Sequence, residues 1–233
     1  MPYYINPYYF DYTYILAIIA VVISLIASAG VKSTFNRWSK ERTHSGLSAD
    51  EAARRILNGA GIYDVSVNHI SGDLTDNFNP MNKTLNLSDS VFGSDSIAAV
   101  GVAAHEAGHA IQHSEGYVPI KIRSAIVPVV NIGTRLSLPV ILIGCFMNYN
   151  QVIISAGILL FSLGLLFSLI TLPVEFNASR RAIRILDESG ILSEEELSGA
   201  KKVLFAAAMT YVAGAVGMAL QLLRLILRFK RRR

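Results

Sequence analysis

The chain has 233 residues, of which 52% are hydrophobic and 16% are charged, and its mean hydropathy of +0.42 is too high for an ordinary soluble protein. The net charge is +4, but the basic residues cluster beside apolar segments rather than along one polar face. We therefore predict an integral membrane protein with no nucleic-acid partner. The single cysteine, Cys145, lies in an apolar segment, which excludes a disulfide framework and a cysteine zinc cluster within the chain. Any metal site must use His, Asp and Glu.

Residues 1–31 are predicted to form an extracytoplasmic N-terminus and a first transmembrane helix. The apolar segment Ile15 to Val31, extended by Tyr12 to Tyr14, has about 20 residues, the length that crosses a bilayer core. Residues 1–14 contain no Lys or Arg, unlike the start of a secretory signal peptide, so we expect a retained anchor. The tyrosines are typical of the outer interface, and basic residues suited to the inner side follow the segment: Lys32, Arg37, Lys40 and Arg42.

Residues 32–123 have the mixed charge and the turn residues of a small soluble domain. The basic flank of the first span places this domain in the cytoplasm. Ser48 and Glu51 have the spacing of a capping box, which predicts a helix over Ala49 to Asn58.

Two strands are predicted next in this domain. Tyr63 to Ile70 and Thr84 to Ser88 alternate between apolar and polar residues, and Asp73 to Asn82, rich in Asp, Asn and Pro, is typical of a loop. The sequence therefore predicts a β-hairpin.

An Ala-rich helix is predicted from Ile97 to about His113. Either Ser94 or Asp95 is expected to cap its N-terminus, and Gly116 and Pro119 are expected to end it.

Residues 124–173 are predicted to form a transmembrane hairpin. Its arms are Ser124 to Met147 and Val152 to Pro173, joined by four uncharged residues. Arg135 lies near the middle of the first arm, where insertion costs about 3 kcal/mol, so we expect it to face protein or water.

Residues 174–202 are again polar and basic, which favours the cytoplasmic side. Residues 203–233 leave two alternatives open. The apolar run Val203 to Phe229 is long enough to cross, but crossing would put the basic C-terminal residues outside. Alternatively, Ala206 to Gly217 packs against the Ala-rich helix, and Leu220 to Arg233 lies at the inner interface as a basic amphipathic helix.

Residues 103–113 read Ala-Ala-His-Glu-Ala-Gly-His-Ala-Ile-Gln-His and contain the motif His-Glu-x-x-His. On a helix, His105 and His109 stand one turn apart on one face, so both imidazoles can bind one zinc ion. Glu106 then points at the metal-bound water. Together with the apolar segments, this motif predicts a mainly α integral membrane protein with three or four transmembrane helices and a small α+β, zincin-like catalytic domain in the cytoplasm.

A catalytic zinc ion needs a third protein ligand. His113 lies about 12 Å along the helix from His105, too far for joint coordination, and Glu115 stands where an extended motif would have a third His. Glu175 is the sole carboxylate between residues 116 and 186, and the membrane hairpin returns it to the depth of the two histidines. We predict that Glu175 is the third ligand; an ordinary Glu at a helix start is the alternative. Three arginines that follow are interpreted as inner-leaflet anchors, one of which could instead hold the ligand Glu: Arg180, Arg181 and Arg184.

Three segments, Leu74 to Pro80, Ile97 to His113 and Leu172 to Ala182, resemble the YugP-like family of bacterial membrane-bound neutral zinc metallopeptidases. The resemblance covers nearly the whole chain. It implies a zinc protease distantly similar to HtpX and the CAAX prenyl proteases, and it makes zinc ligands of His105, His109 and Glu175 and a general base of Glu106. In that pattern an Asp is common where this chain has Asn177, and the HtpX-type Asp is here Ser179.

We therefore predict a multi-pass protein of the bacterial inner membrane that uses Zn²⁺ to hydrolyse peptide bonds at the cytoplasmic face. The substrate is expected to be a peptide or a membrane protein, and it could add as a strand to an edge at Thr84 to Ser88. Glu106 takes a proton from the zinc-activated water, and Tyr211 and His69 are candidates for stabilising the oxyanion. The sequence does not indicate an oligomeric state.

A second hypothesis is a non-catalytic membrane scaffold or chaperone with a structural metal site. Such a site has four closed protein ligands and no use for Glu106. A transporter is disfavoured, because Arg135 is the sole charge within the better-defined spans and no carboxylate lies there to carry a cation.

Overall fold

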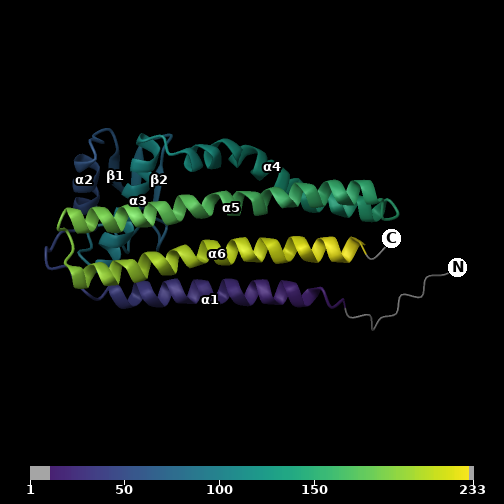
Figure 1. Cartoon of the computed structure of the whole chain (residues 1–233), viewed down its shortest axis with the longest axis horizontal. Helices are drawn as coiled ribbons and strands as arrows, with labels where there is room; N and C mark the ends of the chain where they lie inside the picture. Colours follow the sequence, from purple (N-terminus) through teal and green to yellow (C-terminus); the bar gives the residue numbers. More distant parts are fainter. Residues whose placement is uncertain (1–10, 231–233) are drawn as a thin grey trace.

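The structure is a computed structural model that describes residues 11–230. The predictions for residues 1–10 and 231–233 lie outside the described part. Four long helices run side by side along the molecule: α1 (Tyr14–Trp38), α4 (Val118–Phe146), α5 (Gln151–Glu188) and α6 (Glu194–Lys230) (Figure 1). Among the described residues, these four helices are long and apolar enough to cross a membrane.

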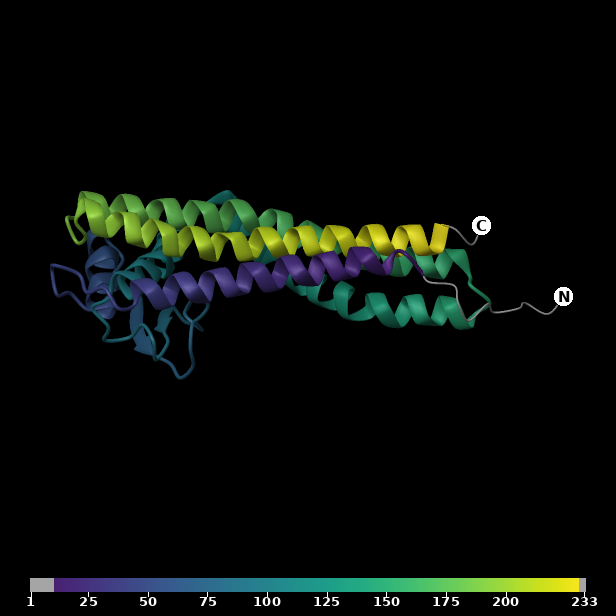
Figure 2. The ribbon, with the colours of Figure 1, turned by 90° about the horizontal axis from the view of Figure 1, so that it is seen from below.

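The remaining elements gather at one end of this bundle, and the first residues of α1 and the last of α6 lie at the other end (Figures 1 and 2). They are α2 (Ala49–Gly59), β1 (Ser66–His69), β2 (Asn77–Asn79), β3 (Thr84–Leu87) and α3 (Ile97–Ser114). We call these elements the compact part, and the end of the bundle where they lie the compact end. The molecule is therefore mainly helical, as its sequence predicts, and it has a small three-stranded sheet.

The predicted hairpin between the first and last strands is wrong. The sheet order is β1-β3-β2, in which β1 and β3 are parallel and β2 is antiparallel to β3. The strand β2 has the sequence Asn-Phe-Asn and lies inside the predicted loop, where its polar composition concealed it. It forms the actual hairpin with β3, through a turn in which Lys83 has a φ of 51°. Both sides of β3 are paired, so this strand offers no free edge to a substrate.

The two helices of the compact part, α2 and α3, both begin at a serine N-cap. The capping box predicted for α2 is confirmed, with the Ser48 amide donating to the Glu51 carboxylate at 3.3 Å. The helix α3 begins at Ile97 as predicted, but its N-cap is Ser96 rather than Ser94 or Asp95. The Ser96 hydroxyl accepts a hydrogen bond from the Ala99 amide, and Ser94 instead donates to Ser96.

The helix α3 is buried on most of its surface, with α2 on one side and α5 and α6 on others. Its alanines are almost fully buried, so the neighbouring helices approach its backbone closely. At Gly108 a Cβ atom would lie 2.9 Å from the carbonyl oxygen of Ala178 on α5. The crossing of α3 and α5 is thus set by direct backbone contact.

The long helices also differ from prediction. Pro173 does not end the second arm of the hairpin, because α5 continues through it to Glu188. The C-terminal segment is one continuous helix lying along α1, and Arg228 comes within 3.9 Å of Asp11, which favours the spanning alternative. Arg135 is exposed on α4, and the expectation that it faces protein or water stays a prediction.

Candidate metal site

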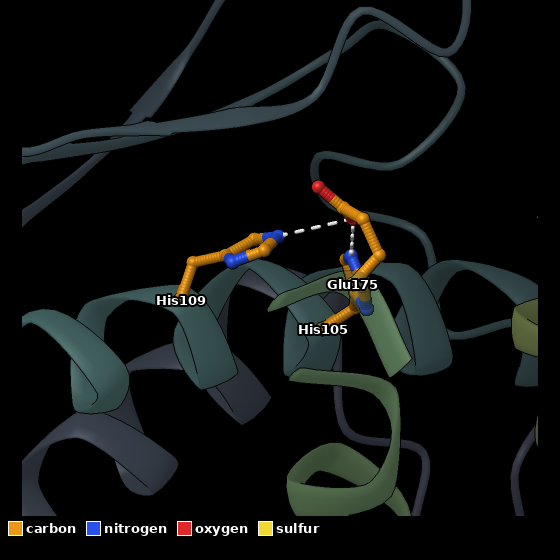
Figure 3. A group of neighbouring side chains, drawn as sticks. All are labelled: His105, His109 and Glu175. Carbon is orange, nitrogen blue, oxygen red and sulfur yellow. Dashed lines mark ion pairs between the residues drawn. The ribbon is translucent and has the colours of Figure 1, made fainter. Parts of the chain in front are cut away.

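The predicted ligands come together where α3 crosses α5. His105 and His109 lie one turn apart on α3, and Glu175 projects from α5 so that one carboxylate oxygen faces both rings (Figure 3). Oε2 of Glu175 is 3.3 Å from Nε2 of His105 and 3.5 Å from Nε2 of His109. The donor atoms of all three residues lie within 4.8 Å of one another.

This arrangement fits a tetrahedral zinc ion. Two atoms each bound about 2.0–2.1 Å from a tetrahedral ion lie about 3.3 Å apart. The observed separations between Oε2 of Glu175 and the two Nε2 atoms have this size. Oε2 of Glu175 is also fully buried and has no hydrogen-bond partner, a costly arrangement that a bound cation would relieve. The donor set of two imidazoles and one carboxylate is one that zinc prefers.

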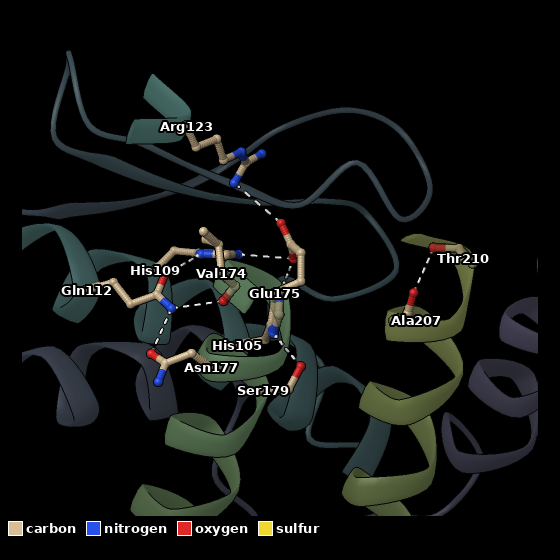
Figure 4. A network of polar contacts seen from close by, with 10 residues as sticks. All are labelled: His105, His109, Gln112, Arg123, Val174, Glu175, Asn177, Ser179, Ala207 and Thr210. Atoms are coloured by element: carbon tan, nitrogen blue, oxygen red, sulfur yellow. Dashed lines mark hydrogen bonds and ion pairs between the residues drawn. The ribbon is translucent and has the colours of Figure 1, made fainter. Parts of the chain in front are cut away.

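Gln112 fixes the orientation of His109 (Figure 4). Its Nε2 donates to the carbonyl of Val174 and to Oδ1 of Asn177, each at 2.9 Å. The side-chain oxygen of Gln112 must therefore face His109, whose Nδ1 lies 3.1 Å away. Because Nδ1–H donates to that oxygen, the lone pair of His109 is on Nε2, the atom that faces Glu175.

Ser179 and Asn177, where the resemblance leads us to expect Asp, also support the site. Ser179 places its hydroxyl 3.1 Å from Nδ1 of His105 and can orient that ring in the same way. Asn177 accepts from Gln112 and, at 2.8 Å, from Nε of Arg181. Neutral side chains thus occupy the places where Asp is expected.

The other oxygen of Glu175 is held from α4. Oε1 lies 3.3 Å from a guanidinium nitrogen of Arg123, while Oε2 faces the histidines (Figure 4). The Glu175 side chain is only 2% exposed, so water cannot stabilise its charge and Arg123 does so at Oε1. Arg123 thereby fixes which oxygen of the carboxylate is available to a metal ion.

Glu106 lines a cavity of about 240 Å³ together with His105 and Glu175. Asp76, from the loop before β2, and Tyr211, from α6, line the same cavity. Burial raises the pKa of Glu106 above its usual range, although the neighbouring histidines oppose the shift. Burial likewise raises the pKa of Asp76, against the hydrogen bonds that Ser88 donates to it. The cavity thus joins the metal-binding group to a buried carboxyl group able to accept a proton.

Sequence comparisons agree with this geometry. The family described as "Putative neutral zinc metallopeptidase" matches residues 13–230. The chain belongs to this family. It is also 44% identical, over 214 residues, to a protein of Bacillus subtilis (strain 168) named "Putative membrane protease YugP", an alignment that covers 92% of this chain and 95% of that protein. No solved structure matches the chain.

In this member of the zinc metallopeptidase family, other candidate residues lie away from the metal-binding group. The ring of His113 packs edge-on against that of Phe78, with the ring centroids 6.0 Å apart. Glu115 forms an ion pair with Arg181, whose nitrogen lies 2.7 Å from the carboxylate oxygen. His69 lies 2.7 Å from Asp89 at the end of β1 and does not line the cavity. Of the two oxyanion candidates, the structure therefore brings only Tyr211 to the cavity.

Sequence reasoning missed Gln112 and Arg123. Gln112 had a signal, since it lies three residues after His109 and therefore next to it on the helix. Arg123 had none, because its contact with Glu175 depends on how α4 leaves the compact part.

Proposed function

We propose that the protein is a zinc-dependent membrane peptidase that hydrolyses peptide bonds with Glu106 as general base. The observation that carries this proposal is the juxtaposition of the three donors His105, His109 and Glu175 with a cavity that Glu106 lines. A structural zinc site would have four protein ligands. Within residues 11–230 no fourth His, Cys, Asp or Glu joins the group, which disfavours the scaffold or chaperone hypothesis.

His105 and His109 would hold zinc through Nε2, and Glu175 through Oε2. When bound, zinc supplies a Lewis acid that polarises the substrate carbonyl and lowers the pKa of water. Glu106 accepts the proton of the attacking water and returns it to the leaving amine. Burial suits Glu106 to this exchange, because a raised pKa brings a carboxyl group closer to neutral pH.

Tyr211 is the residue we assign to the developing oxyanion. It lies on the α6 wall of the cavity, beside the Glu175 carboxylate and across from α3. A phenol hydroxyl can donate a hydrogen bond to negative charge on the former carbonyl oxygen.

The substrate strand is assigned to β2 rather than to β3. The strand β2 is the edge strand that contacts α3, whereas the opposite edge strand, β1, contacts α2. An extended peptide paired with β2 would therefore run along the metal-binding helix. We place this end of the molecule at the cytoplasmic face of the bacterial inner membrane, where the substrate is a peptide or an exposed segment of a membrane protein.

The test of this function is the Glu106→Gln variant. Glutamine keeps the shape of the side chain and leaves every proposed ligand intact, so the purified variant should bind zinc as the native protein does. Peptide hydrolysis should fall by at least about 100-fold, because the general base is lost. Zinc content is measured by metal analysis and turnover with a mixture of unstructured peptides. Turnover that survives in the variant, with contaminating proteases removed, would sink the proposed mechanism.

A further inference from the structure

A second hollow lies between α5 and α6 and is separate from the catalytic cavity, although Ser179, Leu204 and Ala208 line both. Its volume is about 550 Å³. Its lining is mostly apolar and includes three cationic side chains. The lining residues are Phe176, Ser179, Arg180, Ile183, Ser198, Lys201, Lys202, Leu204, Phe205 and Ala208. We call this hollow the α5–α6 groove.

The cationic side chains of the α5–α6 groove lack acidic partners. Within the described chain, no carboxylate lies within 4 Å of Arg180, Lys201 or Lys202. The two neighbouring arginines on α5 differ, because Arg181 pairs with Glu115 and Arg184 lies near Glu188. Lys202 instead lies over the ring of Trp38, with its Nζ 5.4 Å from the ring centroid. The groove therefore carries positive charge that the protein itself does not neutralise.

Apolar and cationic side chains are ordered in the same way on both walls. On α5, Phe176 lies nearer the apolar part of the bundle, and Arg180 follows one turn later toward the compact end. On α6, which runs in the opposite direction, Lys201 lies nearer the compact end, and Phe205 follows one turn later toward the apolar part. Phe205 is 62% exposed, so its ring is available to an apolar ligand. Ile183 lies beyond Arg180 on α5, but on both walls an aromatic ring lies on the apolar side of a cationic side chain along the bundle axis.

We propose that the α5–α6 groove binds an anionic glycerophospholipid. An acyl chain would lie against Phe176 and Phe205, and the phosphate would lie between Arg180 and Lys201. Charge complementarity selects this ligand, because a zwitterionic headgroup has no net charge to offer the unpaired cations. The ordered walls match a lipid standing in the leaflet on the compact side of the bundle. The groove contains none of the three metal-binding residues and not Glu106, although Ser179, which contacts His105, lines it.

The experiment is native mass spectrometry of the full chain in a neutral detergent, titrated with palmitoyl-oleoyl phosphatidylglycerol or with the matching phosphatidylcholine. The phosphatidylglycerol should bind at least about tenfold more tightly, and the Arg180→Gln/Lys201→Gln variant should lose this preference. The Arg54→Gln/Arg184→Gln variant removes the same charge outside the groove and should keep it. Equal binding of the two lipids, or equal losses in the two variants, would overturn the proposal.

Two further arms separate a lipid from other occupants. The Phe205→Ser variant should weaken phosphatidylglycerol binding severalfold, because the acyl chain loses its apolar contact. If the Phe205→Ser variant binds phosphatidylglycerol as tightly as the native protein does, the acyl chain does not bind in the groove. If glycerol 3-phosphate binds as tightly as the whole lipid, the groove is a phosphate site only. Either result would contradict the proposed lipid site. Protein purified with mild detergent should retain anionic lipid in the native form and not in the Arg180→Gln/Lys201→Gln variant. A peptide retained there in place of lipid would also contradict the proposal.

Discussion

The two oxygens of Glu175 have different partners, and this division explains how a buried carboxylate is oriented in the site. Oε1 faces Arg123 and Oε2 faces the two histidines. A carboxylate held by a guanidinium at one oxygen keeps a fixed orientation at the other. The geometry for metal binding is thus built by three elements, α3, α4 and α5.

The first prediction at this scale concerns Glu175 as the third ligand. Replacing a residue that only hydrogen-bonds to a metal ligand typically lowers metal affinity about 10–100-fold. Glu175→Ala removes a ligand, so zinc affinity should fall by more than this, and activity should be lost with it. Glu188→Ala is the matched control, because Glu188 lies on the same helix near Arg184, away from the metal-binding group. Isothermal titration with zinc compares both variants with the native protein. Wild-type zinc affinity in the Glu175 variant would place the third ligand elsewhere.

The second prediction concerns Tyr211 as oxyanion donor. Tyr211→Phe removes one hydroxyl from the cavity wall, so kcat should fall about 100-fold while KM and zinc content stay near the native values. Tyr63→Phe serves as control, since Tyr63 is exposed on the surface of the compact part. A phosphinic peptide that mimics the transition state should also bind the Tyr211 variant less tightly. Native kcat in that variant would rule out the assigned role.

The residues of the site that were predictable are those fixed by short-range geometry or by gross topology. His105, Glu106 and His109 follow from helix periodicity, and Glu175 follows from the return of the membrane hairpin. Tyr211 was one of two open candidates, because its approach depends on how α6 packs against α3. Packing between distant helices leaves no local pattern in the sequence.

At the scale of elements, strong local signals gave correct boundaries and weak ones did not. The helices α2 and α3 have capping residues and apolar periodicity, and both begin where predicted. The strand β2 has three residues, two of them Asn, and its pairing depends on β3 rather than on its own propensity. Pro173 signals a break, yet α5 is continuous, so helix packing outweighs the lost backbone hydrogen bond.

The contact between α3 and α5 gives the prediction for this scale. Gly108→Ala would place a methyl group 2.9 Å from the carbonyl oxygen of Ala178, a backbone atom that moves only with its helix. Overpacking of this kind costs about 1–3 kcal/mol and should push Glu175, one turn before Ala178, away from the histidines. Thermal unfolding and zinc titration should both show a loss.

Gly214→Ala is the control for this variant, because nothing lies within 4 Å of a Cβ atom at Gly214 on α6. This change should leave zinc affinity unaltered and should not lower stability, since alanine favours a helix more than glycine does. If Gly108→Ala matches the control in both measurements, the close crossing of α3 and α5 does not determine the site.

At the scale of the whole molecule, the direction of the long helices links the compact part to the chain ends. Following the chain, α1 runs toward the compact end, α4 away from it, α5 toward it and α6 away again (Figures 1 and 2). If all four helices cross the membrane, the compact part lies on one side. The α4–α5 connection, the start of α1 and the end of α6 then lie on the other side. The sequence signals the change from apolar to mixed-charge composition near Lys32 and its reversal after Arg123, although α1 itself continues to Trp38.

The side that holds the compact part is the last prediction. The basic residues after the first apolar segment favour the cytoplasm, so cysteines introduced at the exposed Asn68 or Asn82 should resist a membrane-impermeant thiol reagent in intact cells. A cysteine at Asn148, in the α4–α5 connection at the other end of the bundle, should react readily, as should one at Asn6. The background is Cys145→Ala, which removes the native cysteine. Permeabilised cells should label at all positions, which shows that each cysteine is accessible. Labelling of Asn68 and Asn82 in intact cells with Asn148 protected would invert the orientation and place the metal-binding group outside the cytoplasm.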